Sequence, residues 1–350
     1  MDIIHKLINL VAPQACFFTL FLFLPPFYIY KFFISTLNAL FSESMSNKVV
    51  LVTGASSGIG EHIAYQYAKK KASLALVARR ENRLHEVAER ARSLGSPDVL
   101  VLSADVAKSE DCKRFVQETM DHFGRLDHLV NNAGIGAVCM FEDAIDLTNF
   151  TPVMDVNFWG AIYPTHFAIP HLKKSRGRVV VNASSAGWLP MPRTSFYNAS
   201  KAATISFYET LRVEFGPDIK ITIVTPGWIE SEMTQGTFLS KEGEIIVDQE
   251  MRDVQVGLSP VGYAEGCAKA IVNSACRGER YVTQPAWFRV LYLYRVFCPE
   301  VIEWVFRMLY ITSPGASQRS AHSKKILDLI GAKKVLYPSS IQEETAVKTE

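Results

Sequence analysis

The stretch from Lys48 to Gly60 constrains the fold of this chain more than any other part of its sequence. Residues 48–52 read Lys-Val-Val-Leu-Val and predict a short buried strand, and the turn Thr-Gly-Ala-Ser-Ser-Gly-Ile-Gly follows directly. From Glu61 onward, apolar residues recur at helical spacing. A strand, a glycine-rich turn and a helix in this order bind the phosphates of a dinucleotide in doubly wound α/β folds. The sequence therefore predicts an α/β protein with a doubly wound parallel sheet.

The glycines of this turn allow the backbone to approach a pyrophosphate, which the positive end of the following helix attracts. Their spacing is GxxxGxG and not GxGxxG, so a glycine-rich turn without a ligand is the alternative. The context of strand and helix favours the cofactor site. The residues expected to contact the cofactor are Gly54, Ser56, Ser57, Gly58, Ile59 and Gly60.

The end of the second predicted strand, at residues 73–78, indicates which nicotinamide cofactor the chain uses. In an NAD site, an acidic residue about 20 positions beyond the glycine turn holds the ribose 2′-hydroxyl. That distance from Gly60 leads to Arg80, which directly follows Arg79. Two guanidinium groups suit a 2′-phosphate instead. We therefore predict NADP as the cofactor.

Two further strand ends supply candidates for the cofactor site. Asp105 follows a predicted strand at residues 98–103, where its carboxylate either accepts from the adenine amino group or caps a helix. A predicted strand at residues 126–130 ends in small polar residues, which fit the ligand crevice at the carboxyl edge of a doubly wound sheet. The residues expected to line the cofactor there are Asn131, Asn132, Ala133 and Gly134.

A serine, a tyrosine and a lysine between residues 184 and 201 predict proton-transfer chemistry. Tyr197 and Lys201 are four residues apart, so on a helix they share one face. A free phenol has a pKa of about 10, and an ammonium one turn away moves that pKa towards neutral pH. Ser184 follows an apolar predicted strand and is placed to polarise the reacting oxygen. A YxxxK pattern alone would equally suit an ordinary amphipathic helix.

Six ordered motifs together resemble the short-chain dehydrogenase/reductase family. They are TGASSGIG, NNAG, Asn157 within Val-Asn-Phe-Trp-Gly, Ser184, YNASK and Pro226-Gly227. The resemblance covers residues 46–285. It implies a single Rossmann domain that transfers hydride between a nicotinamide and an alcohol or ketone.

The resemblance also implies a role for each matching residue. Tyr197 would be the general acid/base, Lys201 would lower its pKa and hold the nicotinamide ribose, and Ser184 would orient the substrate oxygen. Asn157 would keep a water that links Lys201 to solvent. The further cofactor contacts that it implies are Pro226, Gly227 and, against the phosphates, Ser231.

Longer stretches resemble one branch of that family, the steroleosins, which are plant oil-body hydroxysteroid dehydrogenases related to 11β-hydroxysteroid dehydrogenase. These stretches are the apolar N-terminus with its prolines, FGRLDHLVNNAG, FYNASK and residues 281–304. The likeness implies an NADP-linked activity on hydroxysteroids or related plant sterols, at the surface of an oil body.

The chain begins with a long apolar stretch, residues 7–40, which Pro13, Pro25 and Pro26 interrupt. A cleaved signal peptide fits poorly, because no small-x-small site follows it. About 20 apolar residues suffice for a spanning helix, but the proline pair would break it. We favour a hairpin with arms at residues 7–24 and 27–41, attached to a lipid-droplet monolayer or an endoplasmic reticulum membrane.

The C-terminal third contains two stretches relevant to the substrate. Residues 228–255 are polar and predict a mobile lid, in which Met233, Phe238 and Leu239 shape an apolar pocket. Residues 287–311 are apolar and aromatic, with charges that argue against a spanning helix. They predict either a buried or dimer-forming helix pair, hence a possible homodimer, or a membrane-facing patch beside the substrate entrance.

These patterns divide the chain into four parts. We expect an N-terminal anchor at residues 1–45, a Rossmann domain at 46–285, a helical extension at 286–335 and a disordered tail at 336–350.

Composition excludes several other classes of protein. The chain is 48% hydrophobic and 21% charged with a formal charge of +2, which gives no electrostatic reason to bind nucleic acid. Its six cysteines show neither CxxC pairs nor ligand spacing, so we predict no metal site and a reducing compartment. Sequons at Asn182 and Asn198 overlap the catalytic segment, which favours a catalytic domain that faces the cytosol.

Four functions remain open at this point. The first is an NADP-dependent dehydrogenase of hydroxysteroids or sterol-like lipids on oil bodies, and the second has the same chemistry on a retinoid or ketoacyl group. The third is a structural coat protein of the lipid droplet, against which the intact catalytic residues argue. The fourth is a sterol-binding regulator with little turnover.

Overall fold

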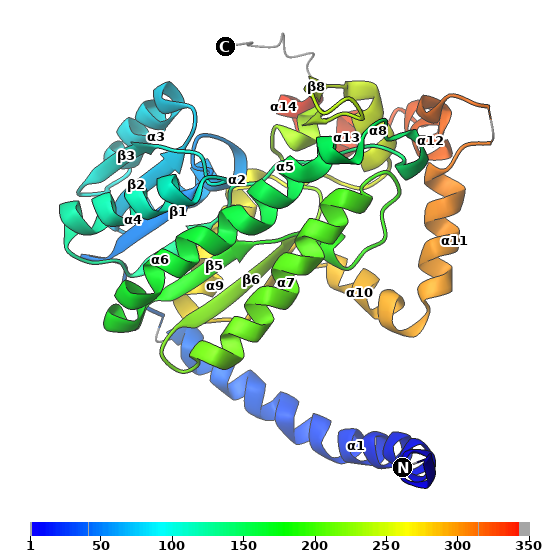
Figure 1. Ribbon diagram of the computed structural model, residues 1–350, viewed down its shortest axis with the longest axis horizontal. Coiled ribbons are helices and arrows are strands. Elements are labelled where there is room, and N and C mark those ends of the chain that lie inside the picture. The colour runs from blue at the N-terminus through cyan, green and yellow to red at the C-terminus, as the bar shows by residue number, and fades with distance from the viewer. Residues whose placement is uncertain (1, 41, 314, 343–350) are drawn as a thin grey trace. The chain divides into compact units, whose positions relative to one another are not determined.

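The computed structural model describes residues 2–40, 42–313 and 315–342 (Figure 1). The chain divides into two compact units, one that extends to Glu43 and one that begins at Ser44. The first contains the helix α1 (Asp2–Leu40), and the second contains every strand of the described chain.

Helix α1 is continuous, with Pro13, Pro25 and Pro26 inside it. The predicted hairpin is therefore wrong. A proline removes one backbone donor and bends a helix, but reversal of the chain between two helices needs a non-helical connection of about 2–5 residues. The segment at residues 24–27 reads Leu-Pro-Pro-Phe and offers no glycine or polar residue for such a turn. The stretch Asp2–Ile34 is long and apolar enough to cross a membrane once.

The second unit is built on a seven-stranded sheet in the order β3-β2-β1-β4-β5-β6-β9, with every neighbouring pair parallel. The reversal of strand order between β1 and β4 is the topological switch point, where doubly wound folds bind ligands. The strands are β1 (Val49–Thr53), β2 (Ser73–Ala78), β3 (Val99–Ser103), β4 (His128–Asn131), β5 (Arg178–Asn182), β6 (Lys220–Pro226) and β9 (Tyr281–Gln284).

Alternate residues of each strand feed two cores, one on each face of the sheet. Val50 and Val52 pack with α2 (Gly58–Lys69), α3 (Glu81–Ser93) and α9 (Ala264–Arg277). Val49 and Leu51 pack on the other face, because successive strand residues point in opposite directions. The helices there are α4 (Ser109–Phe123), α6 (Gly160–Ser175) and α7 (Ser195–Phe215). The prediction of a doubly wound α/β sheet is thus confirmed.

Shorter elements connect β4 to β5 and β5 to α9, and further helices follow β9. Those between β4 and β5 are η1 (Phe141–Asp143), η2 (Leu147–Phe150), α5 (Thr151–Met154) and the π-helix η3 (Asp155–Trp159). Those between β5 and α9 are η4 (Ser185–Gly187), η5 (Met233–Gln235), β7 (Thr237–Leu239), β8 (Ile245–Val247) and α8 (Gln249–Val256). After β9 come α10 (Phe288–Phe297), α11 (Pro299–Tyr310), η6 (Gln318–Ser320), α12 (His322–Leu329), α13 (Lys333–Leu336) and α14 (Ser339–Gln342).

The segment 336–342, predicted to belong to a disordered tail, is folded against the catalytic unit. Tyr337 and Ile341 are buried, and the Tyr337 hydroxyl donates to the carbonyl of Gly257 at 2.9 Å. Two apolar side chains and several backbone hydrogen bonds outweigh the polar composition from which we expected disorder. Residues 343–350 of the expected tail lie outside the described part of the chain.

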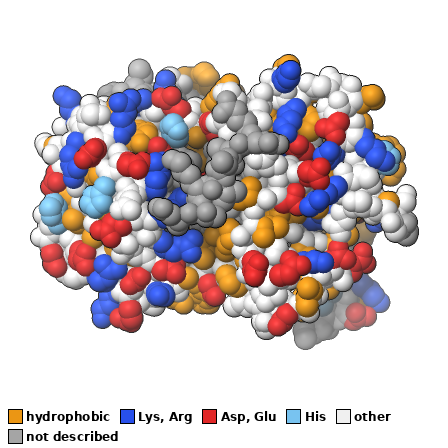
Figure 2. Space-filling view, turned by 90° about the horizontal axis from the view of Figure 1, so that it is seen from above, with side chains coloured by type: hydrophobic (Ala, Val, Ile, Leu, Met, Phe, Trp, Pro, Cys, Tyr) orange, Lys and Arg blue, Asp and Glu red, His pale blue; other side chains and the backbone are white. Residues whose placement is uncertain are grey.

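Charges of both signs are interspersed over the face shown in Figure 2. Among the described side chains visible there, Lys and Arg alternate with Asp and Glu. This distribution agrees with the small net charge of the sequence.

Candidate active site

The glycine turn joins β1 to α2 and has no space for larger residues. A Cβ at Gly60 would lie 2.2 Å from the carbonyl oxygen of Gly54 and 2.4 Å from Nδ2 of Asn132. Gly54 has a φ of +65°, which favours glycine. Asn132 fixes the turn, because its Nδ2 donates to the Gly54 carbonyl at 3.2 Å. Ser57 precedes α2 without a side-chain cap, so the first backbone N–H groups of α2 are available to an anion.

Arg80 leaves the end of β2 and crosses to the glycine turn. Its Nη2 donates to the hydroxyls of Ser56 at 3.1 Å and Ser57 at 2.9 Å. Its Nη1 pairs with Oε1 of Glu232 at 2.6 Å. A guanidinium and two hydroxyls in contact form a site that suits a phosphate group.

Asp105 and Ser231 both line the cavity that includes the glycine turn. The carboxylate of Asp105 accepts from the backbone N–H of Ala107 at 3.1 Å, so it caps a local turn. Its contact with adenine stays a prediction. Ser231 faces the glycine turn, because a Cβ at Gly58 would lie 3.4 Å from the Cβ of Ser231.

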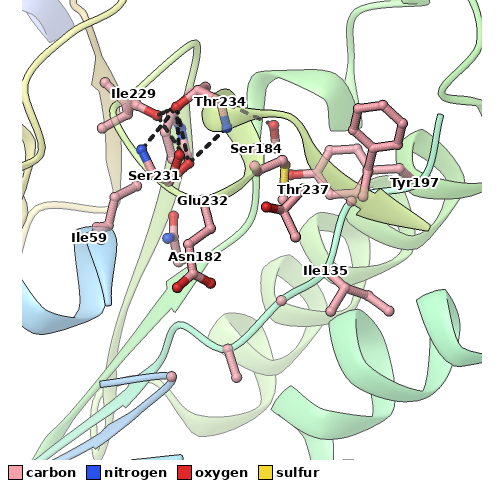
Figure 3. Close-up of a pocket in the computed structure, with 18 of the residues that line it drawn as sticks. Ile59, Ile135, Asn182, Ser184, Tyr197, Ile229, Ser231, Glu232, Thr234 and Thr237 are labelled. Carbon is pink, nitrogen blue, oxygen red and sulfur yellow. Dashed lines mark hydrogen bonds between the residues drawn. The ribbon is translucent and has the colours of Figure 1, made fainter. Parts of the chain in front are cut away.

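Helix α7 places Tyr197 and Lys201 one turn apart, and Ser184 lies just beyond β5. The Lys201 ammonium donates to the carbonyl of Asn182 at 3.1 Å and lies 5.6 Å from the centroid of the Tyr197 ring. The hydroxyl of Ser184 lies near the phenol of Tyr197 and lowers its pKa, and it donates to the carbonyl of Pro226 at 3.4 Å. Figure 3 shows Ser184 and Tyr197 at one end of the group of lining residues and Ile59 with Ser231 at the other. The reacting groups and the cofactor groups thus lie along one cavity.

Asn157 does not line the cavity but hydrogen-bonds to residues next to those that do. It lies in the π-helix η3, where its Oδ1 accepts from the N–H of Ile135 at 2.8 Å and its Nδ2 donates to Ser200 at 3.0 Å. A Cβ at Gly134 would lie 3.1 Å from Oδ1 of Asn157 and 3.4 Å from Nζ of Lys201. Oδ1 of Asn157 and Nζ of Lys201 therefore both lie close to Gly134. This position agrees with the predicted water that links Lys201 to solvent through Asn157.

Burial controls the proton affinities at this site. It raises the pKa of Tyr197, and the hydroxyl of Ser184 opposes that effect. Burial also lowers the pKa of Lys201 to about 8. The expected fall in the pKa of Tyr197 is therefore not found, because desolvation of the phenol dominates. At neutral pH Tyr197 holds its proton.

A cavity of about 490 Å³ brings nearly all of the predicted residues together. Gly60 and Asn157 are not among its lining residues and act through packing and hydrogen bonds. Asn131 points elsewhere, with Nδ2 bonded to Thr165 and Tyr208. The predicted residues that line the cavity are Gly54, Ser56, Ser57, Gly58, Ile59, Arg79, Arg80, Asp105, Asn132, Ala133, Gly134, Ser184, Tyr197, Lys201, Pro226, Gly227 and Ser231.

The structure adds cofactor-end residues that sequence reasoning missed. Asn182 ends β5 and donates to Oδ1 of Asn132 at 2.8 Å, and its own Oδ1 is buried with no partner in the described ranges of the chain. Like Asn132, it lies at the end of a predicted strand, and this position could have identified it from the sequence. Glu232 contacts Arg80 across the cavity, and no local pattern indicates that contact.

The substrate end is lined mainly by apolar side chains from the segment after β6 and from α10. Met233 and Phe238 line the cavity as predicted, whereas Leu239 is buried in a neighbouring cluster. Trp228 and Phe288 complete the wall, and Phe288 packs so closely on Gly227 that a Cβ there would lie 2.3 Å from its ring. An apolar wall of this kind suits a lipophilic substrate.

Helices α10 and α11 form the predicted pair, but most of their large side chains are not buried. Phe288, Ile302 and Tyr310 point inward, while Phe297 is 76% exposed and Trp304 64% exposed. The interpretation as a buried pair is therefore wrong for this surface. Large apolar side chains that are exposed together, as on α10 and α11, indicate contact with another apolar surface.

Comparisons with known proteins agree with this geometry. The family model described as short chain dehydrogenase matches residues 48–242. The chain is 60% identical over 342 residues to 11-beta-hydroxysteroid dehydrogenase A of Sesamum indicum, with 98% of each chain covered. It is 57% identical to 11-beta-hydroxysteroid dehydrogenase A of Arachis hypogaea, with 100% of each covered, and 58% identical to 11-beta-hydroxysteroid dehydrogenase 1A of Arabidopsis thaliana, with 98% of each covered.

Among solved structures, the chain is similar to an alcohol dehydrogenase from the archaeon Thermococcus sibiricus in complex with 5-hydroxy-NADP. The TM-score is 0.55 and the sequence identity 26%, and the match covers 67% of this chain and 94% of the other.

Proposed function

The chain belongs to the short-chain dehydrogenase family, and from that premise we propose that it is an NADP-dependent hydroxysteroid dehydrogenase. It would interconvert a hydroxyl and a keto group on a steroid or sterol-like lipid at the surface of oil bodies. The observation that carries the proposal is one cavity with Ser184 and Tyr197 at an apolar end and Arg80 at the glycine turn. The names of the similar plant proteins support the substrate class.

The residues present fit a nicotinamide dinucleotide. The cavity extends along the glycine turn to the N-terminus of α2, and the buried Oδ1 of Asn182 is an acceptor that has no partner among the described residues. Arg80 with the hydroxyls of Ser56 and Ser57 suits a 2′-phosphate, which supports NADP over NAD.

The chemistry of the side chains follows from their burial. When bound, the nicotinamide supplies or accepts the hydride. Tyr197 keeps its proton at neutral pH and donates it to the oxygen of a ketone, while Ser184 hydrogen-bonds to the same oxygen and orients it. In the opposite direction the phenolate of Tyr197 removes the hydroxyl proton. Lys201 would hold the nicotinamide ribose and return protons to Tyr197.

The N-terminal helix supports a membrane-associated enzyme. Asp2–Ile34 exceeds the length that a bilayer requires, and a substrate that partitions into oil would be taken from the same phase. We propose attachment to an oil body or endoplasmic reticulum membrane through this helix, with the catalytic unit in the cytosol. The exposed surface of α10 and α11 is a second candidate for contact with lipid or with another copy of the chain.

Deletion of residues 1–41 tests the attachment. We expect the truncated protein to leave lipid droplets in a flotation assay and still bind NADP. Retention on droplets would shift the role of anchor to residues 287–311, and a truncated protein that is soluble but dimeric would assign α10 and α11 to a protein interface.

The test of the activity is steady-state turnover on a panel of hydroxysteroids and ketosteroids with NADP(H) and NAD(H). We expect turnover with the NADP pair, and a loss of about 10²- to 10⁴-fold in Tyr197→Phe, which removes the transferable proton. Binding of NADP by the variant should equal that of the wild type. Absence of turnover on every steroid, with NADP still bound, would contradict the substrate class and lead to retinoids and ketoacyl compounds.

A further inference from the structure

Two polar side chains of helix α8 lie in the wall of the cavity. Arg252 and Gln255 are three residues apart, so they share one face of the helix. Both line the same cavity as Ser184 and Tyr197. Arg252 is 2% exposed and Gln255 3% exposed, so bulk solvent does not reach their polar groups.

The hydrogen bonds of this pair are incomplete. Among the residues that the structure describes, Gln255 has no hydrogen-bond partner for Nε2 or for Oε1, and both atoms are buried. Arg252 donates from Nε to Asp253 at 2.7 Å and from Nη1 to the carbonyl of Ile341 at 2.9 Å, but no group in the described part of the chain accepts from its Nη2. A buried amide without hydrogen bonds destabilises a fold, so such groups in native proteins usually have a specific reason.

No hydrogen bond within the described residues gives a structural reason for an amide at position 255. Its neighbours in sequence, Val254 and Val256, are buried in apolar contacts. Trp228 and Phe288 belong to the same cavity wall. A leucine would fill this wall if the ligand were apolar throughout, so the amide indicates a polar group on the ligand.

The free atoms define what that group must be. Nη2 of Arg252 and Nε2 of Gln255 are donors, and Oε1 of Gln255 is an acceptor. A hydroxyl accepts from a donor and gives its hydrogen to an acceptor, whereas a ketone or a carboxylate has no hydrogen for Oε1. The carboxylate of Asp253 pairs with both Arg252 and Lys333, so the choice of a hydroxyl over an anion rests on the acceptor Oε1.

We propose that Gln255, together with Arg252, binds a second hydroxyl group of the substrate, remote from the oxygen that reacts at Tyr197. This inference rests on the proposed function and narrows the substrate class to rigid lipophilic alcohols or ketones with a further hydroxyl. Gln255 is then a specificity-determining residue, because it distinguishes such compounds from analogues with a single oxygen.

The experiment compares androstanediol with the androstanol that keeps only the reacting hydroxyl. Binding to the full-length protein with saturating NADP is measured by quenching of tryptophan fluorescence, since Trp228 lines the cavity. Turnover is measured separately on the same two compounds. The variants are Gln255→Leu and, as the matched control, Gln249→Leu, the same replacement on α8 outside the cavity lining.

We expect the wild type and Gln249→Leu to bind the diol about 10- to 100-fold more tightly than the monohydroxy compound. In Gln255→Leu the two affinities should converge within about threefold, with the affinity for the monohydroxy compound unchanged and a melting temperature no lower than that of the wild type. Such a result cannot come from misfolding.

Equal affinities in the wild type would overturn the inference, as would a preference for the diol that survives in Gln255→Leu or a failure of both compounds to bind. A preference for the diol that depends on Gln255, without turnover of either compound, would uphold the binding site and contradict the proposed activity. The two proposals can therefore fail separately.

Discussion

The cavity has two ends that are built in different ways. At the cofactor end, backbone atoms and short side chains form the wall, and Asn132 hydrogen-bonds to the glycine turn through its backbone and its amide. At the substrate end, the wall consists of side chains from the segment after β6, from α8 and from α10, and neither amide atom of Gln255 has a partner in the described chain. At the cofactor end, close backbone packing leaves almost no room for substitutions. At the substrate end, a single substitution can change the shape or polarity of the wall.

This difference has a physical meaning. Every nicotinamide dinucleotide presents the same pyrophosphate, so close backbone contact at the glycine turn serves any substrate. Substrate choice needs groups that are unsatisfied until the correct ligand arrives, because a missing partner then penalises the wrong ligand. Mutations at the cofactor end should therefore abolish binding of NADP. Mutations at the substrate end should alter the affinity for the substrate by graded amounts.

The largest effect that we expect comes from Gly60→Ala. The added methyl would meet the Gly54 carbonyl oxygen at 2.2 Å, so the turn must move. We expect NADP binding to weaken by more than about 100-fold and the free energy of unfolding to fall by about 1–3 kcal/mol. Calorimetric titration and denaturant unfolding measure the two quantities.

Gly266→Ala is the control for that variant, since a Cβ at this helical glycine meets no atom within 4 Å. It should stabilise the protein by about 0.5–1 kcal/mol. If Gly60→Ala bound NADP like the wild type, the contrast between the two ends would not hold.

The second effect concerns the choice of cofactor. Arg80→Asp removes the guanidinium beside Ser56 and Ser57 and places a carboxylate near a 2′-phosphate. We expect NADP affinity to fall about 10- to 100-fold and NAD to become the better ligand. Arg83→Asp on α3, outside the cavity lining, should leave the ratio unchanged. A preference for NADP that survives in Arg80→Asp would assign the phosphate to Arg79.

The third effect is a dependence on pH. Burial lowers the pKa of Lys201 to about 8, so its ammonium is present below that pH and is lost above it. Tyr197 keeps its proton over the same range, because burial raises its pKa. We expect kcat/KM for ketone reduction to be level below pH 7 and to fall about fivefold between pH 8 and pH 9. In Lys201→Arg the fall should move to higher pH, and a wild-type profile that stays level to pH 10 would contradict the assignment.

The smallest effect should follow truncation after Leu336. The deletion removes the Ile341 carbonyl that accepts from Arg252 and the Tyr337 hydroxyl that bonds to Gly257. Helix α8 would lose its support, so we expect KM for the substrate to rise about two- to fivefold while NADP affinity stays constant. Removal of residues 343–350 alone should leave KM unchanged. A loss of NADP affinity in the longer truncation would show that the two ends are coupled.

The sequence predicts the cofactor end well because its determinants are local. The turn between β1 and α2, the switch point beside Asn132 and the Tyr197–Lys201 spacing each depend on a few consecutive residues or one helical period. The doubly wound sheet follows from the same signals, since each strand is a short apolar run that ends in polar residues.

The substrate end could not be predicted in the same way. Gln255 and Phe288 reach the cavity through tertiary packing, and no spacing in the sequence relates them to Ser184. The fold of residues 336–342 depends on two buried side chains, Tyr337 and Ile341, in a polar stretch. The prolines of the N-terminal stretch are also misleading. They predict a break in the helix, but α1 continues through Pro13, Pro25 and Pro26, because a proline bends a helix without reversing the chain.

The contact between Ile341 and Arg252 also sets an order of events during synthesis. A ribosome makes the chain from its N-terminus at about 5–20 residues per second. The glycine turn, Arg80 and Tyr197 are complete well before residue 341 is made, so a nascent chain can assemble its cofactor end while the wall formed by α8 still lacks support. A message that ends before codon 337 would therefore yield a protein that binds NADP but has a raised KM for its substrate.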